Sequence, residues 1–173
     1  MVGYKIAIIG SRGYRYVYSG YEIFIKELAG RPISRKYEYS QKFKAISDPQ
    51  LLFTDYVPDP VELAELYHGC YAYLHGHEFG GTNPSLLMAL GCGCAVCALD
   101  TLFNREVLKD GEHGLFFLKD ENSLKNRIEE MEYHPEELDR LRMKSRARIE
   151  ANYSWDKILG QYLVLFDKVI KER

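Results

Sequence analysis

The chain has 173 residues, of which 46% are hydrophobic and 28% charged, and its 23 basic and 25 acidic side chains give a formal net charge of −2. This composition supports one domain or slightly more with a hydrophobic core, which excludes a disordered chain. The near-neutral charge argues against nucleic-acid binding, which normally needs a basic face. No run approaches the ~18 apolar residues of a membrane span, and the N-terminus is unlike a signal peptide, so a soluble cytoplasmic protein is expected.

Three of the four cysteines, Cys92, Cys94 and Cys97, lie within GCGCAVCALD. The segment is typical of a helix end followed by a buried strand, where cysteine behaves as a small hydrophobic residue. The spacing C-x-C-x-x-C matches no standard zinc finger and lacks a fourth ligand. A structural role is therefore favoured over metal binding, and neither a metal nor a cofactor is expected.

The first predicted element is a buried strand at residues 5–10, KIAIIG. After a loop at 10–20, a helix is predicted that ends at Gly30 and Pro32. Its apolar stripe consists of Tyr21, Phe24, Ile25 and Leu28. Residues 31–49 are polar and basic without a clear period, so an irregular junction is expected there.

Strands and helices alternate from residue 50 onward. Strands are predicted at 51–57, 70–75, 94–100 and 114–118, with helices after Asp59-Pro60, after Asn83-Pro84 and around 103–109. Three helices follow from Glu121, the second beginning at Pro135 and the third capped by Ser154. The alternation predicts an α/β fold, a Rossmann-like parallel sheet with helices on both faces and a C-terminal helical segment. The stripe of the last helix is Ile158, Tyr162, Leu165, Phe166 and Ile170.

Ligands of parallel sheets bind outside the carboxyl ends of the strands, which directs attention to the loops at 10–20, 75–83, 99–105 and 55–59. In the second loop, Gly80 and Gly81 allow close backbone approach, and the helix beginning near Thr82-Asn83-Pro84-Ser85 offers amides and a positive dipole end. A diphosphate suits this geometry. Alternatively, Asn83 only caps the helix and the glycines only form a turn; the sequence favours neither interpretation.

The same strand end carries His75, His77 and Glu78. Such a cluster has the chemistry of a metal site or of an acid–base group. Because no further ligand at usable spacing is visible, hydrogen bonds to a sugar or to the backbone are favoured.

Two other loops carry arginines. Arg12 and Arg15 in GSRGYRYVYSG have the charge to neutralise phosphate oxygens, and a ligand role is favoured for the glycines of this loop, including Gly13. The loop does not match the dinucleotide fingerprint G-x-G-x-x-G. Arg105 opens a later helix, where a phosphate or carboxylate ligand and a surface pair with Glu106 are equally compatible with the sequence.

HGHEFGGTNPSLLMALGCGCAV, ALDTLFNREVL and GLFF together resemble the donor-binding half of a group 1 (family 4) retaining glycosyltransferase, most closely its rhamnosyltransferase-like branch in bacterial surface polysaccharide synthesis. ANYSWDKILGQY resembles the closing helix of that family, so the resemblance covers roughly residues 3–30 and 50–165. The opening IAIIGSRGYRYVYSGYEIF is similar to the N-terminal signature of the branch, matching it at Gly10, Arg12, Gly13, Tyr18, Gly20 and Glu22.

The resemblance implies two Rossmann-like domains, which need about twice this length. Residues 1–30 are similar to the start of the acceptor domain, 31–49 form the junction, and 50–173 are similar to the donor, or nucleotide-sugar, domain with its C-terminal helices, all within one compact domain. The chain is thus internally shortened relative to the family. KIAIIG is hypothesised to replace the missing first strand of the donor domain, paired with FTDYV.

The resemblance also implies the site. Residues 80–85 would contact the diphosphate and Glu78 the sugar, with Arg12 and Gly13 on the other side. No metal is required, and the acceptor would be a saccharide or a lipid-linked saccharide at the inner face of the membrane. The family places a ribose-binding glutamate where this chain has Met88, whose thioether is a poor hydrogen-bond acceptor. Two functions stay open: nucleotide-sugar-dependent hexosyl or rhamnosyl transfer, and a non-catalytic nucleotide- or sugar-binding module or inactive remnant.

Overall fold

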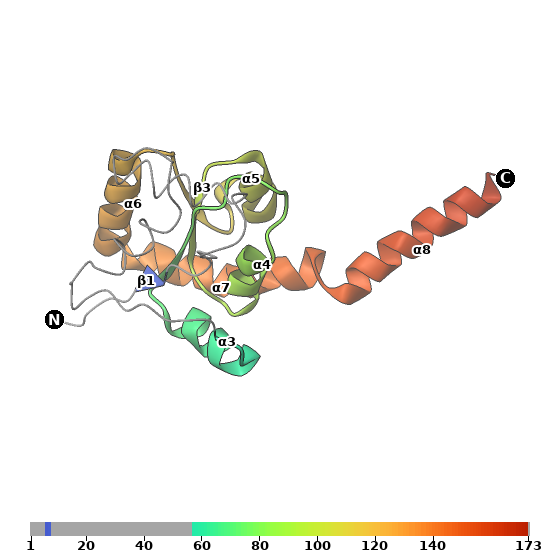
Figure 1. The fold of residues 1–173 in the computed structure, drawn as a ribbon, viewed down its shortest axis with the longest axis horizontal. Coiled ribbons are helices and arrows are strands. Elements are labelled where there is room, and N and C mark those ends of the chain that lie inside the picture. The colour runs from blue at the N-terminus through green and yellow to red at the C-terminus, as the bar shows by residue number, and fades with distance from the viewer. Residues whose placement is uncertain (1–5, 8–56, 173) are drawn as a thin grey trace, which may run out of the picture.

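The structure, a computed structural model, describes residues 6–7 and 57–172. Within these residues, four parallel strands form one sheet in the order β1-β2-β3-β4 (Figure 1). The strands are β1 (Ile6–Ala7), β2 (Ala72–His75), β3 (Val96–Leu99) and β4 (Leu115–Phe117). The predicted α/β fold with a Rossmann-like parallel sheet is confirmed.

The beginning of the chain joins this sheet. Ile6 pairs with Ala72 and Ala7 with Tyr73, both in parallel register. Ile6 and Ala7 of KIAIIG therefore form a strand beside β2, which is compatible with the hypothesis of a replacement strand. Its proposed pairing with FTDYV, the helix at 21–28 and the junction at 31–49 lie outside the described residues.

The described helices begin where local signals predict them. They are α3 (Pro60–Gly69), α4 (Pro84–Gly91), α5 (Leu102–Leu108), α6 (Glu121–Tyr133), α7 (Pro135–Asn152) and α8 (Trp155–Lys171), and a 3-10 turn, η1 (Lys109–Gly111), follows α5. The side chains of Asp59, Asn83 and Ser154 accept hydrogen bonds from backbone amides of α3, α4 and α8, respectively. These caps satisfy amides that the first turn of a helix leaves unpaired, which fixes where each helix starts.

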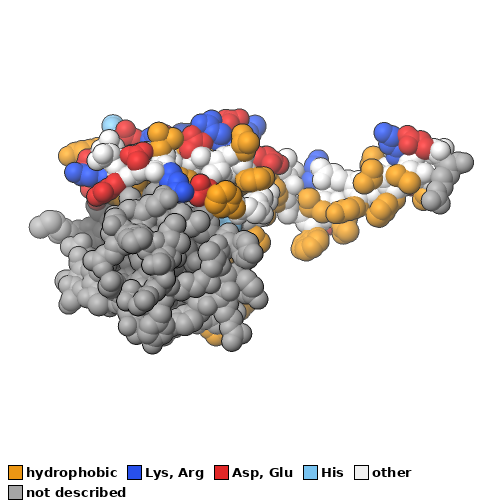
Figure 2. All heavy atoms as spheres, turned by 45° about the horizontal axis from the view of Figure 1, so that its top comes forward, with side chains coloured by type: hydrophobic (Ala, Val, Ile, Leu, Met, Phe, Trp, Pro, Cys, Tyr) orange, Lys and Arg blue, Asp and Glu red, His pale blue; other side chains and the backbone are white. Residues whose placement is uncertain are grey.

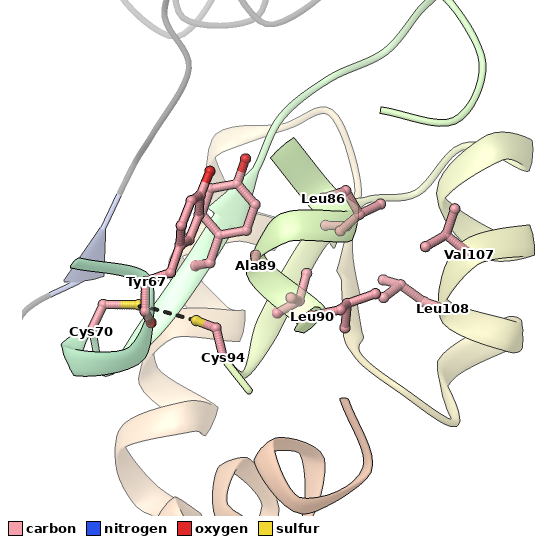
Figure 3. Packing of buried hydrophobic residues seen from close by; sticks show 11 residues of the cluster. Tyr67, Cys70, Leu86, Ala89, Leu90, Cys94, Val107 and Leu108 are labelled. Carbon is pink, nitrogen blue, oxygen red and sulfur yellow. Dashed lines mark hydrogen bonds between the residues drawn. The ribbon is translucent and has the colours of Figure 1, made fainter. Parts of the chain in front are cut away.

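Successive strand residues point to opposite faces of the sheet, and each face has its own core. Tyr73, Val96 and Ala98 pack with α3, α4 and α5 in a first cluster, which Figure 3 shows from close by. Leu74, Cys97 and Leu99 pack with α6 and α7 in a second cluster, completed by Ala72, Ala95, Phe117, Met131, Leu138 and Leu141. The prediction of helices on both faces is thus confirmed.

The cysteines mostly behave as core residues. Cys94 and Cys97 are almost fully buried, as predicted for small hydrophobic side chains, whereas Cys92 is only half-buried. The Sγ atoms of Cys70 and Cys94 lie 3.1 Å apart, where an S–H···S hydrogen bond joins the end of α3 to the segment before β3 (Figure 3).

The C-terminal helix α8 runs away from the sheet and its covering helices (Figure 1). The sequence predicts an apolar stripe along it, and most of that stripe is exposed, including Tyr162, Leu165, Phe166 and Ile170. In the described part of the chain, every helix is too short or too polar to cross a lipid bilayer.

Candidate functional site

The carboxyl ends of the parallel strands bring three loops to one edge of the sheet. β2 ends at His75, β3 at Leu99 and β4 at Phe117. Two contacts show that the following loops meet: Lys119 Nζ lies 3.0 Å from a carboxylate oxygen of Glu78, and Asn104 Nδ2 donates to the backbone oxygen of His77 over 3.1 Å. The edge therefore gathers side chains that are far apart in the sequence.

The loop between β2 and α4 contains the two glycines that the sequence singles out. Gly80 and Gly81 have φ values of 101° and 77°, in the left-handed region that L side chains rarely adopt. A Cβ on Gly80 would make only ordinary contact with His77 Nε2, at 3.8 Å, and one on Gly81 would meet no atom within 4 Å. The backbone conformation of this turn therefore favours glycine at both positions, and the space around them within the chain is open. Thr82, which lies between the two glycines and α4, is exposed.

Asn83 is the N-cap of α4. Its side chain accepts a hydrogen bond from the Ser85 amide over 2.9 Å, and its backbone oxygen accepts from the amides of Leu86 and Leu87. Pro84 has no N–H, and the amides of the next three residues all bond to Asn83. The amides of the first helical turn therefore already have partners within the chain. Asn83 therefore caps α4. An anion at this end of α4 would interact with the helix dipole and with loop amides rather than with those of the first turn.

A buried polar row lies beneath this loop. Tyr73 Oη and His75 Nδ1 are 2.9 Å apart, and Tyr67 on α3 hydrogen-bonds to both Tyr73 and Ser85. His75 is only 3% exposed, and in the described part of the chain its Nε2 has no hydrogen-bond partner. Burial, with a smaller contribution from His77, lowers the pKa of His75 to about 3, so its imidazole is neutral at pH 7. The sequence pointed to His75, but it gave no sign that the two tyrosines belong to the same row.

His77 and Glu78 lie at the edge itself and are half-buried. The rings of His75 and His77 are 5.9 Å apart, and both oxygens of Glu78 accept hydrogen bonds from Lys119, at 3.0 and 3.3 Å. Lys119 is a residue that the sequence analysis missed. Its signal was its position just after the last predicted strand, at the same edge as Glu78. Among the described residues, no three His, Cys, Asp or Glu side chains are grouped so that they could hold a metal ion.

Arg105 is held by acidic side chains. Its guanidinium donates to both carboxylate oxygens of Asp100, at 2.5 and 2.6 Å, and lies 3.6 Å from Asp110. The hydrogen bond with Asp100 is the main cause of the raised pKa of Arg105. The cation also stacks over the Phe116 ring, with 5.4 Å to the centroid. The sequence considered Glu106 as its protein partner; the structure assigns that role to Asp100.

Asn104 is the second residue that the sequence analysis missed. It is 2% exposed, and Nδ2 donates to the backbone oxygens of Leu99 at 2.8 Å and of His77 at 3.1 Å. One side chain thereby ties the end of β3 to the loop after β2. Arg12 and Gly13, the remaining predicted site residues, lie outside the described residues.

Comparison with known proteins identifies the family of this chain. A family model described as Glycosyl transferase-like matches residues 3–164. The chain belongs to this glycosyltransferase family. No curated protein sequence matches it significantly.

Two solved structures share the fold. Sucrose-phosphate synthase from Thermosynechococcus elongatus is 19% identical with a TM-score of 0.72, over 98% of this chain and 46% of its own. The structure described as the GtfA/B complex is 15% identical with a TM-score of 0.69, over 96% of this chain and 36% of its own. At these identities the likeness establishes the fold alone, and the chain spans less than half the length of either neighbour.

Proposed function

We propose that this glycosyltransferase-family chain binds a nucleotide-sugar at the carboxyl edge of the sheet, with the diphosphate against residues 80–85. The observation that carries the proposal is the convergence of the positive-φ Gly80-Gly81 turn, the N-terminus of α4 and the Glu78–Lys119 pair at this edge. A turn without Cβ atoms allows close approach of phosphate, and the helix dipole and the ammonium group both favour its negative charge.

The reaction that fits this site is transfer of the glycosyl group with retention of configuration, as the family 4 resemblance implies. Negative charge grows on the departing diphosphate in the transition state, and fixed dipoles and cations near it lower the barrier. In this chain the positive end of α4 and Lys119 would supply that stabilisation, while Glu78 would accept a hydrogen bond from a sugar hydroxyl. Arg12 and Gly13 would complete the site from the N-terminal loop, and no metal is needed.

The substrate class follows from the rhamnosyltransferase-like resemblance of HGHEFGGTNPSLL. It supports a hexosyl or rhamnosyl donor and a saccharide acceptor, in the form of a lipid-linked saccharide of bacterial surface polysaccharide synthesis. Such an acceptor would place the chain at the cytoplasmic face of the membrane, in peripheral contact with it.

A second candidate function is nucleotide or sugar binding without turnover. Met88 favours it, because this side chain is 42% exposed on α4 and cannot accept a strong hydrogen bond from a ribose hydroxyl.

Calorimetry with UDP, GDP and dTDP, combined with a transfer assay using the matching sugar nucleotides, tests both candidates. We expect Lys119→Ala to weaken nucleoside diphosphate binding at least about tenfold, because a hydrogen bond to a charged group contributes about 1.5–3 kcal/mol. The matched control is Lys125→Ala on α6, whose side chain is 70% exposed. Binding without transfer would select the binding module, and equal losses in both variants would refute the assigned site.

A further inference from the structure

Two thiol groups touch in the interior of the fold, whereas the apolar side chains of α8 gather at the surface (Figure 2). The Sγ atoms of Cys70 and Cys94 are 3.1 Å apart, and the two residues are 7% and 1% exposed. The sulfur atoms of a disulfide are about 2.05 Å apart. A movement of about 1 Å would therefore bring these two sulfurs to bonding distance.

The backbone around the pair is compatible with such a bond. Cys70 precedes β2 and Cys94 precedes β3, and these strands are neighbours in the sheet. Tyr73 pairs with Val96 in parallel register, and the Tyr73 amide donates to the backbone oxygen of Ala95 over 2.8 Å. Neighbouring strands lie about 4.8 Å apart, within the range of about 4.4–6.8 Å between the Cα atoms of disulfides. Figure 3 shows the two side chains pointing toward each other from these segments.

The hydrogen bonds of the pair indicate where each proton lies. The Cys70 thiol donates to the backbone oxygen of Tyr67 over 3.1 Å. Since a thiol has one proton, Cys94 is the donor in the contact between the two sulfurs, and its Sγ also lies 3.3 Å from the backbone oxygen of Ala95. The hydrogen bond with Cys70, together with burial, raises the pKa of the Cys94 thiol, so Cys94 is neutral at pH 7.

Burial decides which oxidant suits the pair. A bulky thiol reagent needs an accessible sulfur, and neither sulfur of this pair meets that condition. Hydrogen peroxide is little larger than water, and Cys70 is the more exposed of the two residues. Because thiols react more slowly than thiolates, the oxidation should be slow.

We propose that peroxide joins Cys70 and Cys94 in a disulfide that fastens the end of α3 to the segment before β3. Hydrogen peroxide first oxidises the Cys70 thiol to a sulfenic acid and is itself reduced to water. The Cys94 sulfur then attacks the Cys70 sulfur, the S–S bond forms, and the displaced hydroxyl leaves with the Cys94 proton as a second water. Two thiols and one peroxide thus give one disulfide and two waters. The modification is independent of the proposed nucleotide-sugar site.

The bond would close a loop that contains β2, the Gly80-Gly81 turn and α4. Closing a loop of roughly 25 residues restricts the unfolded chain and raises the ratio of folded to unfolded protein by more than about a hundredfold. Reduction of the disulfide should reverse this gain. The thiol pair therefore makes the stability of the chain depend on its oxidation state.

Peptide mapping of the full, unmodified chain tests the proposal. The chain is incubated with hydrogen peroxide, the remaining thiols are blocked with N-ethylmaleimide, and the product is digested without reduction by a protease that cleaves after glutamate. Cleavage at Glu65 and Glu78 separates Cys70 from the other three cysteines. We expect a cross-linked peptide pair whose fragmentation assigns the bond to Cys70 and Cys94, and a urea midpoint that rises on oxidation and falls again with dithiothreitol.

Three variants complete the experiment. Cys70→Ser and Cys94→Ala should both abolish the rise in the urea midpoint, because each removes one sulfur of the pair. The matched control is Cys92→Ser, which removes a half-buried thiol near the pair and should leave the cross-link intact. The proposal is refuted if Cys70 and Cys94 stay reduced while Cys92 is fully oxidised, if the disulfide contains Cys92 or Cys97 instead, or if Cys70→Ser still gains stability with peroxide.

Discussion

Replacing Asn104 with Ala tests how the fold positions the candidate site. The amide of Asn104 is buried at 2% exposure, and its nitrogen serves two carbonyl groups, those of Leu99 at 2.8 Å and His77 at 3.1 Å. The first holds the end of β3, and the second holds the loop that leads to Glu78 and the glycine turn. The substitution removes both hydrogen bonds without placing any new group in the site.

The expected loss of stability follows from these contacts. Each hydrogen bond contributes about 1 kcal/mol net, and a buried carbonyl left without a donor costs up to a few kcal/mol more. We therefore expect Asn104→Ala to lower the free energy of unfolding by about 2–4 kcal/mol. Asn104→Asp should cost at least as much, because it replaces the donor with a carboxylate that faces two carbonyl oxygens.

Urea unfolding followed by circular dichroism measures this difference. Asn126→Ala on α6 is the matched control, because Asn126 is exposed and the change should stay within about 0.5 kcal/mol. If Asn104→Ala also changes stability by less than about 0.5 kcal/mol, the two hydrogen bonds do not hold the loop. If the proposed function is right, nucleoside diphosphate affinity should fall in Asn104→Ala under conditions where the variant remains folded.

Three further predictions concern the core and its titratable groups. Folding lowers the pKa of His75 from 6.5 to about 3, so between these pH values only the unfolded chain binds a proton at this imidazole. The free energy of unfolding should therefore fall by up to about 1.4 kcal/mol for each pH unit below 6.5. Urea midpoints measured at pH 7 and 5.5 should show this slope, and His75→Gln should flatten it. Ellman's reagent should react with half-buried Cys92 in the native chain, and with Cys70, Cys94 and Cys97 only after unfolding. These three thiols are buried, and burial raises the pKa of Cys97 to about 12. Leu90→Ala, at a fully buried position, should lower the free energy of unfolding by about 2–5 kcal/mol in chemical denaturation, whereas Leu163→Ala, 66% exposed on α8, should change it by less than about 0.5 kcal/mol in the monomer.

The order of elements could be predicted because its signals are local. Asp59, Asn83 and Ser154 cap α3, α4 and α8, and Pro60, Pro84 and Pro135 begin α3, α4 and α7. Such signals depend on a few neighbouring residues and survive in any tertiary context. The parallel sheet then follows from strands that alternate with helices.

The partners of the site residues could not be predicted in the same way. Lys119 is 41 positions from Glu78, and Asn104 is 27 positions from His77, so only the packed sheet brings them together. For the apolar side of α8, the residues could be predicted but their partner could not. The sequence shows that one side of this helix is apolar, but periodicity alone does not specify what covers that side.

The pairing of charges at the sheet edge determines which cation is available to a diphosphate. Arg105 donates two short hydrogen bonds to Asp100 and is also close to Asp110, so a phosphate would have to displace a bidentate carboxylate from it. Lys119 contacts both carboxylate oxygens of Glu78 through one atom, Nζ, at up to 3.3 Å. An ammonium group of this kind can turn toward a new anion without breaking the planar, two-bond pairing that a guanidinium makes. We therefore expect Arg105→Ala to affect mainly stability and Lys119→Ala mainly binding. Calorimetry and urea unfolding of the two variants should separate these effects, and a larger loss of affinity in Arg105→Ala would reverse the assignment.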